Sequence, residues 1–265
     1  MKYIASFSGG KDSMATIILA HEHNEPLDMI IFAEVMFDEE TSGELPEHIG
    51  FIREKCIPLF KSWGYEVKIL HADTTYIDHF YHIVTKSKIP ERNGKKQGFP
   101  MAGRCKINDK CKVQPIRDFI KQFDQKEITQ YIGIAADEPK RLARLDGITK
   151  ISPLAAIGWT EADCWKWCEE NDLLSPIYTT ATRGGCWFCH NQSVEQLRLL
   201  RKNYPDLWAL LLKWDLDSPV TFHSDGRTVH DFDRRFQMED EGKIPTDRTF
   251  RWKMVDNPDG REETG

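Results

Sequence analysis

The sequence predicts an α/β fold in which a Rossmann-like parallel sheet carries helices on both faces and is followed by a mainly helical C-terminal part. Up to about residue 155, short apolar runs alternate with longer stretches of helical pattern, which is typical of βαβ units around a parallel sheet. After that point the alternation stops and helical patterns predominate. We therefore predict an α/β domain over residues 1–155 and a helical region over residues 156–265.

Each predicted element rests on its apolar pattern and on the residues that bound it. The short apolar, β-leaning runs predict five strands, at residues 2–7, 28–36, 65–71, 129–135 and 149–154. The stretches between these runs predict helices near residues 13–24, 45–63, 73–86 and 112–123.

Two helix starts can be located in the C-terminal part. Thr160 and Ser193 are followed three residues later by Asp163 and Gln196, which is the pattern of a helix N-cap with a polar residue at the third helical position. The two patterns predict helices near residues 161–171 and 194–213.

The composition is that of an ordinary globular protein. Of the 265 residues, 40% are hydrophobic and 29% are charged, which argues against a disordered chain. The net charge of −6 argues against a protein that grips nucleic acid with its whole surface. The first seven residues hold too short an apolar run for a secretory signal, and no stretch approaches the roughly 20 apolar residues of a membrane span. We therefore expect a cytoplasmic protein with no membrane partner.

The strongest motif follows the first predicted strand. That strand leads into Ser8-Gly9-Gly10-Lys11-Asp12-Ser13, after which a helix-compatible run begins. Consecutive glycines allow N–H groups to converge on an anion at the positive end of a helix, and hydroxyls and a lysine add further donors. The spacing differs from that of the Walker loop and of the dinucleotide fold. The motif predicts a different phosphate-binding loop, with candidate residues Ser6, Ser8, Gly9, Gly10, Lys11, Asp12 and Ser13. A plain glycine turn capped by Asp12 or Ser13 is the alternative.

With this loop the sequence resembles the PP-loop ATP pyrophosphatase superfamily, also described as adenine nucleotide alpha hydrolase-like, whose hallmark is Ser-Gly-Gly-x-Asp-Ser after the first strand. It is more closely similar to the phosphoadenosine phosphosulfate reductase family. The other matching segments keep the family's order over roughly residues 3 to 200, and they are Glu44-Leu45-Pro46-Glu47, Gly133 to Arg141, Ile151 to Leu154, and Gly158 to Asp163. The resemblance implies a sheet that binds an adenine nucleotide at the carboxyl ends of its strands.

The resemblance also implies roles for individual residues. The nucleotide-binding candidates beyond the loop are Asp137, Glu138, Lys140 and Arg141, and the catalytic candidates are Lys11, Asp12 and Asp137. Lys11, the loop amides and Mg²⁺ would stabilise charge on the phosphates. Because hard cations prefer carboxylate oxygen, Asp12, Asp137 and Glu138 are candidates to hold Mg²⁺. The equally weighted alternative is structural, with Asp12 capping a helix and Asp137 orienting Lys140.

Two departures from the family pattern bear on the reaction. Ala135 stands where the family usually has arginine, and Lys140, Arg141 or Arg144 is the candidate replacement as an anion contact. The sequence has no cysteine after Cys189, whereas the family's reductases resemble one another in a C-terminal Glu-Cys-Gly-Leu-His segment whose thiol attacks sulfur. The reductase reaction is therefore the less favoured expectation.

We expect instead an enzyme that binds ATP or a related adenine nucleotide and adenylates an acceptor through the α-phosphate, coupled to sulfur transfer. The acceptor would be a nucleic acid or a small molecule, and a sulfur-donor protein is a candidate partner. The alternatives are a sulfonucleotide (PAPS or APS) reductase and a non-catalytic nucleotide-binding subunit of a larger complex.

Four of the seven cysteines form two pairs in the sequence. Cys186 and Cys189 make a Cys-x-x-Cys motif, and Cys105 and Cys111 lie upstream with five residues between them. Four thiolates from two loops suit either a [4Fe-4S] cluster or tetrahedral Zn²⁺, and a set of unliganded thiols is the alternative. The remaining three cysteines are predicted to be small core residues, and they are Cys56, Cys164 and Cys168.

A basic loop lies between the third and fourth predicted strands. It contains five cationic residues opposed only by Glu91, and they are Lys86, Lys88, Arg92, Lys95 and Lys96. Such a loop could contact an anionic substrate or a nucleic-acid backbone, and a solvated surface loop is the equally favoured alternative.

Overall fold

The computed structural model describes residues 1–100, 105–124, 126–180 and 184–256 of the chain. It divides into two compact units. The first unit comprises residues 1–79 and 105–187, and the second comprises residues 80–104 and 188–265. Each unit is described by itself.

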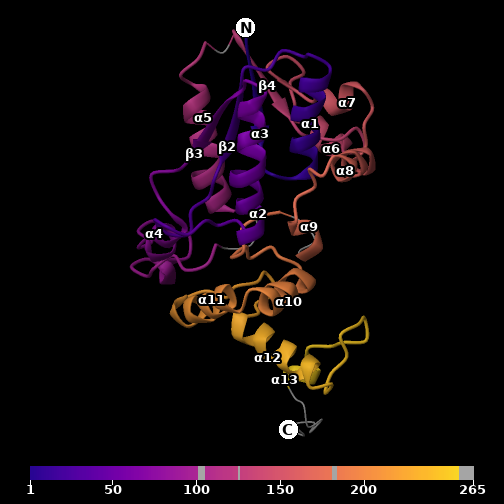
Figure 1. Cartoon of the computed structure of the whole chain (residues 1–265). Coiled ribbons are helices and arrows are strands. Elements are labelled where there is room, and N and C mark those ends of the chain that lie inside the picture. The colour runs from indigo at the N-terminus through magenta and orange to yellow at the C-terminus, as the bar shows by residue number, and fades with distance from the viewer. Residues whose placement is uncertain (101–104, 125, 181–183, 257–265) are drawn as a thin grey trace, which may run out of the picture. The chain divides into compact units, whose positions relative to one another are not determined.

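The first unit is built on a five-stranded sheet in which every neighbouring pair of strands is parallel. The strand order is β3-β2-β1-β4-β5, and Figure 1 labels β2, β3 and β4 with the helices around them. The bounds of the strands are β1 Lys2–Phe7, β2 Met29–Ala33, β3 Glu66–Leu70, β4 Ile128–Ile132 and β5 Lys150–Ile151. The predicted parallel sheet and all five of its strands are therefore confirmed, with shorter bounds at most strand ends.

The central strand, β1, pairs with β2 on one side and with β4 on the other. Ile4 is the partner of Met29 in the first pairing and of Gln130 in the second. The strand order thus reverses beside β1, and open parallel sheets bind ligands at the carboxyl ends of their strands near such a reversal.

The helices of the first unit cover both faces of the sheet. On one face, Ala5 and Ile30 belong to a core that includes residues of α1, α3 and α8. On the other face, Ile4 and Ile31 pack with Ile120 of α5. Successive strand residues point to opposite faces, so β1 and β2 are apolar along nearly their whole length. The helix bounds in this part of the chain are α1 Lys11–Glu22, α2 Pro46–Gly50, α3 Ile57–Ser62, α4 Tyr76–Tyr81, α5 Gln114–Ile120, α6 Pro139–Leu142, α7 Pro153–Ala156, α8 Glu161–Glu170 and α9 Ile177–Thr180.

Two of the predicted helices contain a π-helical stretch. The π-helix η1 (Phe51–Cys56) joins α2 to α3, and the π-helix η3 (Asn108–Val113) leads into α5. In both cases a proline, Pro58 or Pro115, is the second residue of the α-helix that follows. Proline lacks an N–H group and its ring crowds the carbonyl four residues earlier, which accounts for a wider turn at this point.

The second unit is mainly helical in its described part. Its helices are the short 3₁₀ turn η2 Pro90–Arg92, α10 Val194–Asn203, α11 Pro205–Asp217, α12 Val229–Asp240 and α13 Lys253–Asp256. The helical C-terminal part is therefore confirmed. The single helix predicted for residues 194–213 is in fact α10 and α11, because Pro205 cannot continue α10 and begins a new helix instead.

Three features differ from the sequence expectations. The helix predicted at residues 73–86 is only α4, and the strand predicted at residues 149–154 is β5 followed by α7. The compact units also divide the chain differently from the predicted boundary at residue 155, because α8 buries Cys164 and Cys168 in the core beneath the sheet. Within the described residues, no helix is both long and apolar enough to cross a bilayer.

Candidate nucleotide-binding site

The loop predicted to bind phosphate links β1 to α1. Its turn is made by Gly9, whose φ of +74° lies in the left-handed region that favours glycine. A Cβ atom at this position would lie 2.5 Å from His48 Cε1 and 2.7 Å from Ile52 Cδ1. Gly10 has an extended backbone and immediately precedes Lys11, the first residue of α1. Position 9 therefore requires glycine both for its conformation and for its packing.

The segment just after β4 packs closely against the start of α1. A Cβ atom on Gly133, just after β4, would lie 2.7 Å from the Ser13 nitrogen and 2.8 Å from both the carbonyl carbon and the oxygen of Asp12. These are backbone atoms, so no change of rotamer can make room. The absent side chain of Gly133 lets β4 approach the loop directly.

The serines of the motif hold the loop in shape. The Ser8 N–H donates to Ser13 Oγ at 3.1 Å, and the two hydroxyl oxygens are themselves 3.1 Å apart. Ser13 Oγ also donates to the Gly10 carbonyl at 2.9 Å. Ser6 is half-buried within β1. The hydroxyls of Ser8 and Ser13 thus lie together at the loop.

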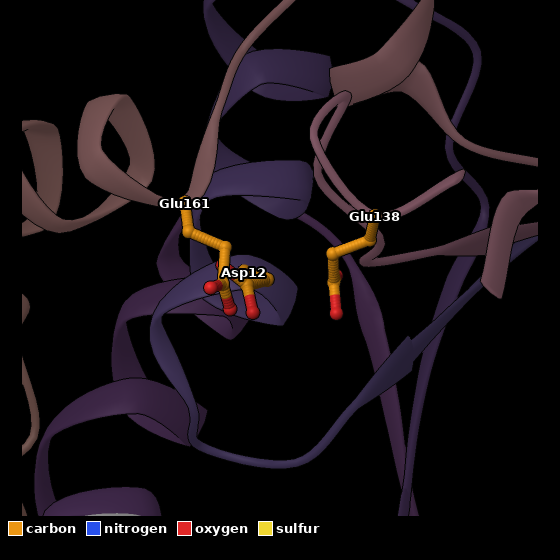
Figure 2. Close-up of side chains that lie close together, drawn as sticks. All are labelled: Asp12, Glu138 and Glu161. Atoms are coloured by element: carbon orange, nitrogen blue, oxygen red, sulfur yellow. The ribbon is translucent and has the colours of Figure 1, made fainter. Parts of the chain in front are cut away.

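Three carboxylates converge beside the lysine of the loop. Lys11 Nζ donates to Asp12 Oδ1 at 2.8 Å and to Glu161 Oε1 at 3.0 Å. Asp12, Glu138 and Glu161 each offer an oxygen atom within 4.8 Å of the others. Figure 2 shows the three side chains pointing toward one another from α1, from the residue before α6 and from the start of α8. Among the described residues this is the one such group of three or more candidate metal ligands.

The environment changes the proton affinities of the charged pair in the loop. Burial alone would lower the pKa of Lys11, but its hydrogen bonds to Asp12 and Glu161 outweigh burial and the pKa is raised. Burial raises the pKa of Asp12, and the hydrogen bond from Lys11 only partly offsets this. Lys11 therefore remains protonated, and the Asp12 carboxylate lies beside the Lys11 ammonium group in a partly buried site.

The segment between β4 and α6 supplies the other predicted residues. Asp137 is exposed, and its Oδ1 accepts the N–H of Glu161 at 3.0 Å, so it fixes the start of α8. Glu138 accepts two hydrogen bonds from Arg141 Nη1, at 2.5 and 2.7 Å, and one from the Ala135 N–H at 3.3 Å. The Arg141 guanidinium is therefore already paired with Glu138. Lys140 lies exposed on the first turn of α6.

Three residues at the loop were not predicted. Glu161 belongs to a segment that carried the family resemblance and follows the predicted N-cap Thr160, so its position could have been a signal. His48 Nε2 lies 3.0 Å from the Ser8 carbonyl oxygen, and Tyr178 Oη accepts the Lys11 N–H at 3.1 Å. These two residues are 40 and 167 positions away from their partners, and no local pattern connects them to the loop.

The four predicted metal-ligating cysteines are divided between the two units. Cys105, Cys111 and Cys186 belong to the first unit, and among its described residues they do not form a group of ligand atoms within 4.8 Å of one another. The buried thiol of Cys111 donates to the Thr74 carbonyl at 3.5 Å, and burial raises its pKa to about 11. Cys189 belongs to the second unit. The four predicted ligands thus come from both units, and the four-cysteine site stays a prediction.

The other three cysteines are core residues, as predicted. Cys56, Cys164 and Cys168 are fully buried in the core of the first unit. Burial is the main cause of the raised pKa of each thiol, which is about 12 for Cys164 and Cys168. Protonated, buried thiols of this kind are poor nucleophiles.

A second polar cluster lies at the carboxyl ends of β2 and β3. Glu34 is completely buried, and its two carboxylate oxygens accept hydrogen bonds from Arg53 Nη2 at 2.9 Å each. His71 Nε2 lies 3.0 Å from the same carboxylate. Burial would raise the pKa of Glu34, but hydrogen bonds from His71, Ser42 and Arg53 outweigh it and the pKa is lowered.

His71 also lines a cavity of about 580 Å³ between the end of β3 and α5. Thr74 and Lys110, which neighbour or contact Cys111, line the same cavity. The cavity is lined by both polar and apolar side chains and lies at the carboxyl end of β3.

The basic loop lies in the second unit. Lys96 forms an ion pair with Asp217 and lies 5.2 Å from the centre of the Tyr81 ring, and Arg92 donates to the Gln97 carbonyl at 2.9 Å. Lys86, Lys88 and Lys95 are exposed. At least two of the five cations thus have structural partners in their own unit.

The chain is similar to proteins from an archaeal genus and from a bacteriophage. An uncharacterised protein of Methanocaldococcus jannaschii is 22% identical over 222 residues, which cover 80% of this chain and 40% of that protein. A second uncharacterised protein of the same organism is 21% identical over 220 residues, covering 78% and 47%. An uncharacterised nin region protein of Escherichia phage lambda is 25% identical over 213 residues, covering 76% and 69%. The chain thus spans less than half the length of the two M. jannaschii proteins.

Among solved structures, the chain is similar to the U34-tRNA thiolase NcsA from Methanococcus maripaludis with its [4Fe-4S] cluster. The alignment has a TM-score of 0.40 and 15% sequence identity, and it covers 89% of this chain and 80% of that one.

The sequence profile of the phosphoadenosine phosphosulfate reductase domain matches residues 2–192. The matched region contains the loop, the carboxylates that converge on it and all seven cysteines. The chain therefore belongs to the phosphoadenosine phosphosulfate reductase domain family.

Proposed function

We propose that the chain is an enzyme that binds the phosphates of ATP, or of a related adenine nucleotide, at the loop Ser8 to Ser13 and promotes attack at the α-phosphate, coupled to sulfur transfer. The observation that carries the proposal is the convergence of a glycine turn, a protonated lysine and three carboxylates at the carboxyl end of β1. Membership in a family of adenine-nucleotide sulfur chemistry supports the same reading.

The charges at the loop suit a nucleotide that arrives with a divalent cation. Asp12, Glu138 and Glu161 offer the carboxylate oxygens that Mg²⁺ prefers. These oxygens lie within 4.8 Å of one another, so a small movement of the side chains, or a bridging water molecule, would allow octahedral coordination. When bound there, Mg²⁺ would neutralise charge on the phosphates.

Lys11 would then change partners. In the structure its ammonium group forms ion pairs with Asp12 and Glu161. When the nucleotide binds, Lys11 would pair with a phosphate oxygen while Mg²⁺ binds the carboxylates, so that the lysine and the carboxylates each keep a partner of opposite charge. Lys11 would stabilise the charge that develops on the phosphates when the acceptor bonds to the α-phosphorus. The bond from the α-phosphorus to the oxygen that bridges it to the β-phosphorus would then break, and pyrophosphate would leave with that oxygen.

The acceptor of the adenylate would be a nucleic acid or a small molecule. The cavity beside β3 is our candidate for its binding place, because it lies at the carboxyl end of the same sheet. A partner protein would deliver the sulfur. The four predicted cysteine ligands are proposed as a [4Fe-4S] or Zn²⁺ site.

The test is to incubate the purified chain with ATP and MgCl₂ and to measure pyrophosphate and AMP. We expect pyrophosphate release that falls at least about 100-fold in Lys11→Met, the size of loss seen when one group that stabilises transition-state charge is removed. Lys61→Met is the matched control, because Lys61 lies exposed on α3, outside the loop. Equal rates in wild type and Lys11→Met would refute the role of the loop.

The second candidate function is sulfonucleotide reduction, because the matched family profile describes a phosphoadenosine phosphosulfate reductase domain. Incubation with adenosine 5′-phosphosulfate or its 3′-phosphorylated form and a dithiol reductant separates the two. Release of sulfite without pyrophosphate formation from ATP would favour the reductase. Tight nucleotide binding without turnover of either substrate would instead favour a nucleotide-binding subunit.

A further inference from the structure

Tyr178 lies directly over the loop that is proposed to bind phosphate. Its hydroxyl oxygen accepts the N–H of Lys11, the first residue of α1, at 3.1 Å. A Cβ atom placed on Gly10 would lie 3.5 Å from the same oxygen. An oxygen atom that accepts from the first amide of a helix, above a glycine turn, stands where a phosphate oxygen would stand in a loop of this kind.

The rest of the Tyr178 side chain is held independently of its hydroxyl group. Its ring packs against Trp165, with the ring centres 4.9 Å apart. Ile177 and Ser175, which precede Tyr178 by one and three residues, are both buried, and Ser175 Oγ lies 2.7 Å from His48 Nδ1. The other ring nitrogen of His48 lies 3.0 Å from the Ser8 carbonyl.

The direction of these two hydrogen bonds can be assigned. A carbonyl oxygen can only accept, so His48 Nε2 must donate to Ser8. In the neutral imidazole Nδ1 then accepts from the Ser175 hydroxyl. The chain before α9 is therefore fastened to the loop through His48, and the tyrosine ring stays near the loop whether or not its hydroxyl is bonded to Lys11.

Two further donors of the loop are also paired within the chain. Lys11 Nζ is paired with Asp12 and Glu161, and the Ser8 N–H donates to Ser13. Burial raises the pKa of Tyr178, so the group on the Lys11 amide is a neutral hydroxyl. A phosphate oxygen is a charged acceptor and forms a stronger hydrogen bond with the same amide.

We propose that the Tyr178 hydroxyl occupies the place of a phosphate oxygen in the ligand-free protein and is displaced when the nucleotide binds, so that Tyr178 lowers the affinity of the loop for phosphate-bearing ligands. This inference rests on the proposed function of the loop. It assigns to Tyr178 a role as a competitor for the Lys11 amide.

The variant Tyr178→Phe removes the hydroxyl and keeps the ring that packs against Trp165. Tyr65→Phe is the matched control, because Tyr65 bonds through its hydroxyl to His21 at the other end of α1. Calorimetric titration would use three probes, each with MgCl₂: α,β-methylene ATP, inorganic pyrophosphate and adenosine. We expect Tyr178→Phe to bind the first two about three- to tenfold more tightly, the factor that corresponds to one competing neutral hydrogen bond. Adenosine affinity in this variant, and all affinities in Tyr65→Phe, should equal those of wild type.

The outcomes separate this inference from the function on which it rests. If the wild type binds α,β-methylene ATP and Tyr178→Phe binds it equally or more weakly, the competition is refuted while the nucleotide site stands. If the wild type binds neither α,β-methylene ATP nor pyrophosphate, the proposed function itself fails. Hydrogen exchange of the Lys11 amide gives a second readout: it should be faster in ligand-free Tyr178→Phe than in wild type, and equal rates would count against the proposed hydrogen bond.

Discussion

Replacing Gly133 by alanine tests how closely β4 approaches the phosphate-binding loop. The added Cβ would lie 2.7 to 2.8 Å from backbone atoms of Asp12 and Ser13, which cannot rotate away. Either β4 or the first turn of α1 must shift. Forcing extra atoms into a packed site in this way typically costs about 1–3 kcal/mol of folding free energy.

A matched alanine substitution gives the opposite expectation. Gly50 lies inside the continuous helix formed by α2 and η1, with a helical φ of −58°, and a Cβ atom there would meet nothing within 4 Å. Alanine is favoured over glycine in a helix by up to about 1 kcal/mol, because glycine loses more backbone entropy on folding. Gly50→Ala should therefore leave the stability unchanged or raise it.

Thermal unfolding followed by circular dichroism measures both variants. At roughly 2–4 °C per kcal/mol for a chain of about this size, Gly133→Ala should lower Tm by about 2–12 °C, and Gly50→Ala should raise it by no more than about 4 °C. Gly133→Ala should also weaken binding of α,β-methylene ATP, because the loop donors move with α1. A Gly133→Ala protein with the Tm and the nucleotide affinity of wild type would refute the close approach of β4.

Three further predictions concern other parts of the chain. Glu34→Gln should lower the free energy of unfolding at pH 7 by about 1.5–3 kcal/mol, the usual worth of a hydrogen bond to a charged group. Since the pKa of Glu34 is lowered on folding, its stabilising contribution is present above the ordinary carboxyl pKa and is lost as the pH falls through the lowered value. Urea unfolding should therefore find wild type and Glu34→Gln converging in acid, and a constant difference would contradict the assignment. Thr160→Ala removes the side-chain cap of α8 and should cost about 1 kcal/mol in the same assay, whereas no loss would show that the capping box contributes little. Elemental analysis after anaerobic purification should find iron or zinc bound per chain, and finding neither metal would contradict the predicted four-cysteine site.

The local pattern of the sequence determined the fold class and several particular features. The alternation of apolar runs and helical stretches predicted the parallel sheet and its five strands, because strands buried on both faces are apolar along their length. The capping boxes at Thr160 and Ser193 were predicted from four residues each, because a cap is closed within one helical turn. The burial of Cys56, Cys164 and Cys168 was predicted because a free cysteine is usually a small core residue.

Elements interrupted by proline were predicted less well. The π-helical stretches before Pro58 and Pro115 and the break at Pro205 all follow from the missing N–H group of proline. Hydrophobic periodicity does not register that local effect, so helix positions were predicted better than helix continuity. The roles of the loop residues in nucleotide binding and of the four cysteines in metal binding stay predictions.

The glycine turn of the loop and the helix start after it could be predicted from consecutive residues. Such a turn is a local structure, because its backbone conformation depends on the glycines themselves. What surrounds the loop was decided only by tertiary structure. Glu161, His48 and Tyr178 reach it from three separate elements, and their contacts depend on how those elements pack rather than on any spacing along the chain. Side-chain contacts between distant segments are set by the shared core beneath them, and that core is a property of the folded chain as a whole.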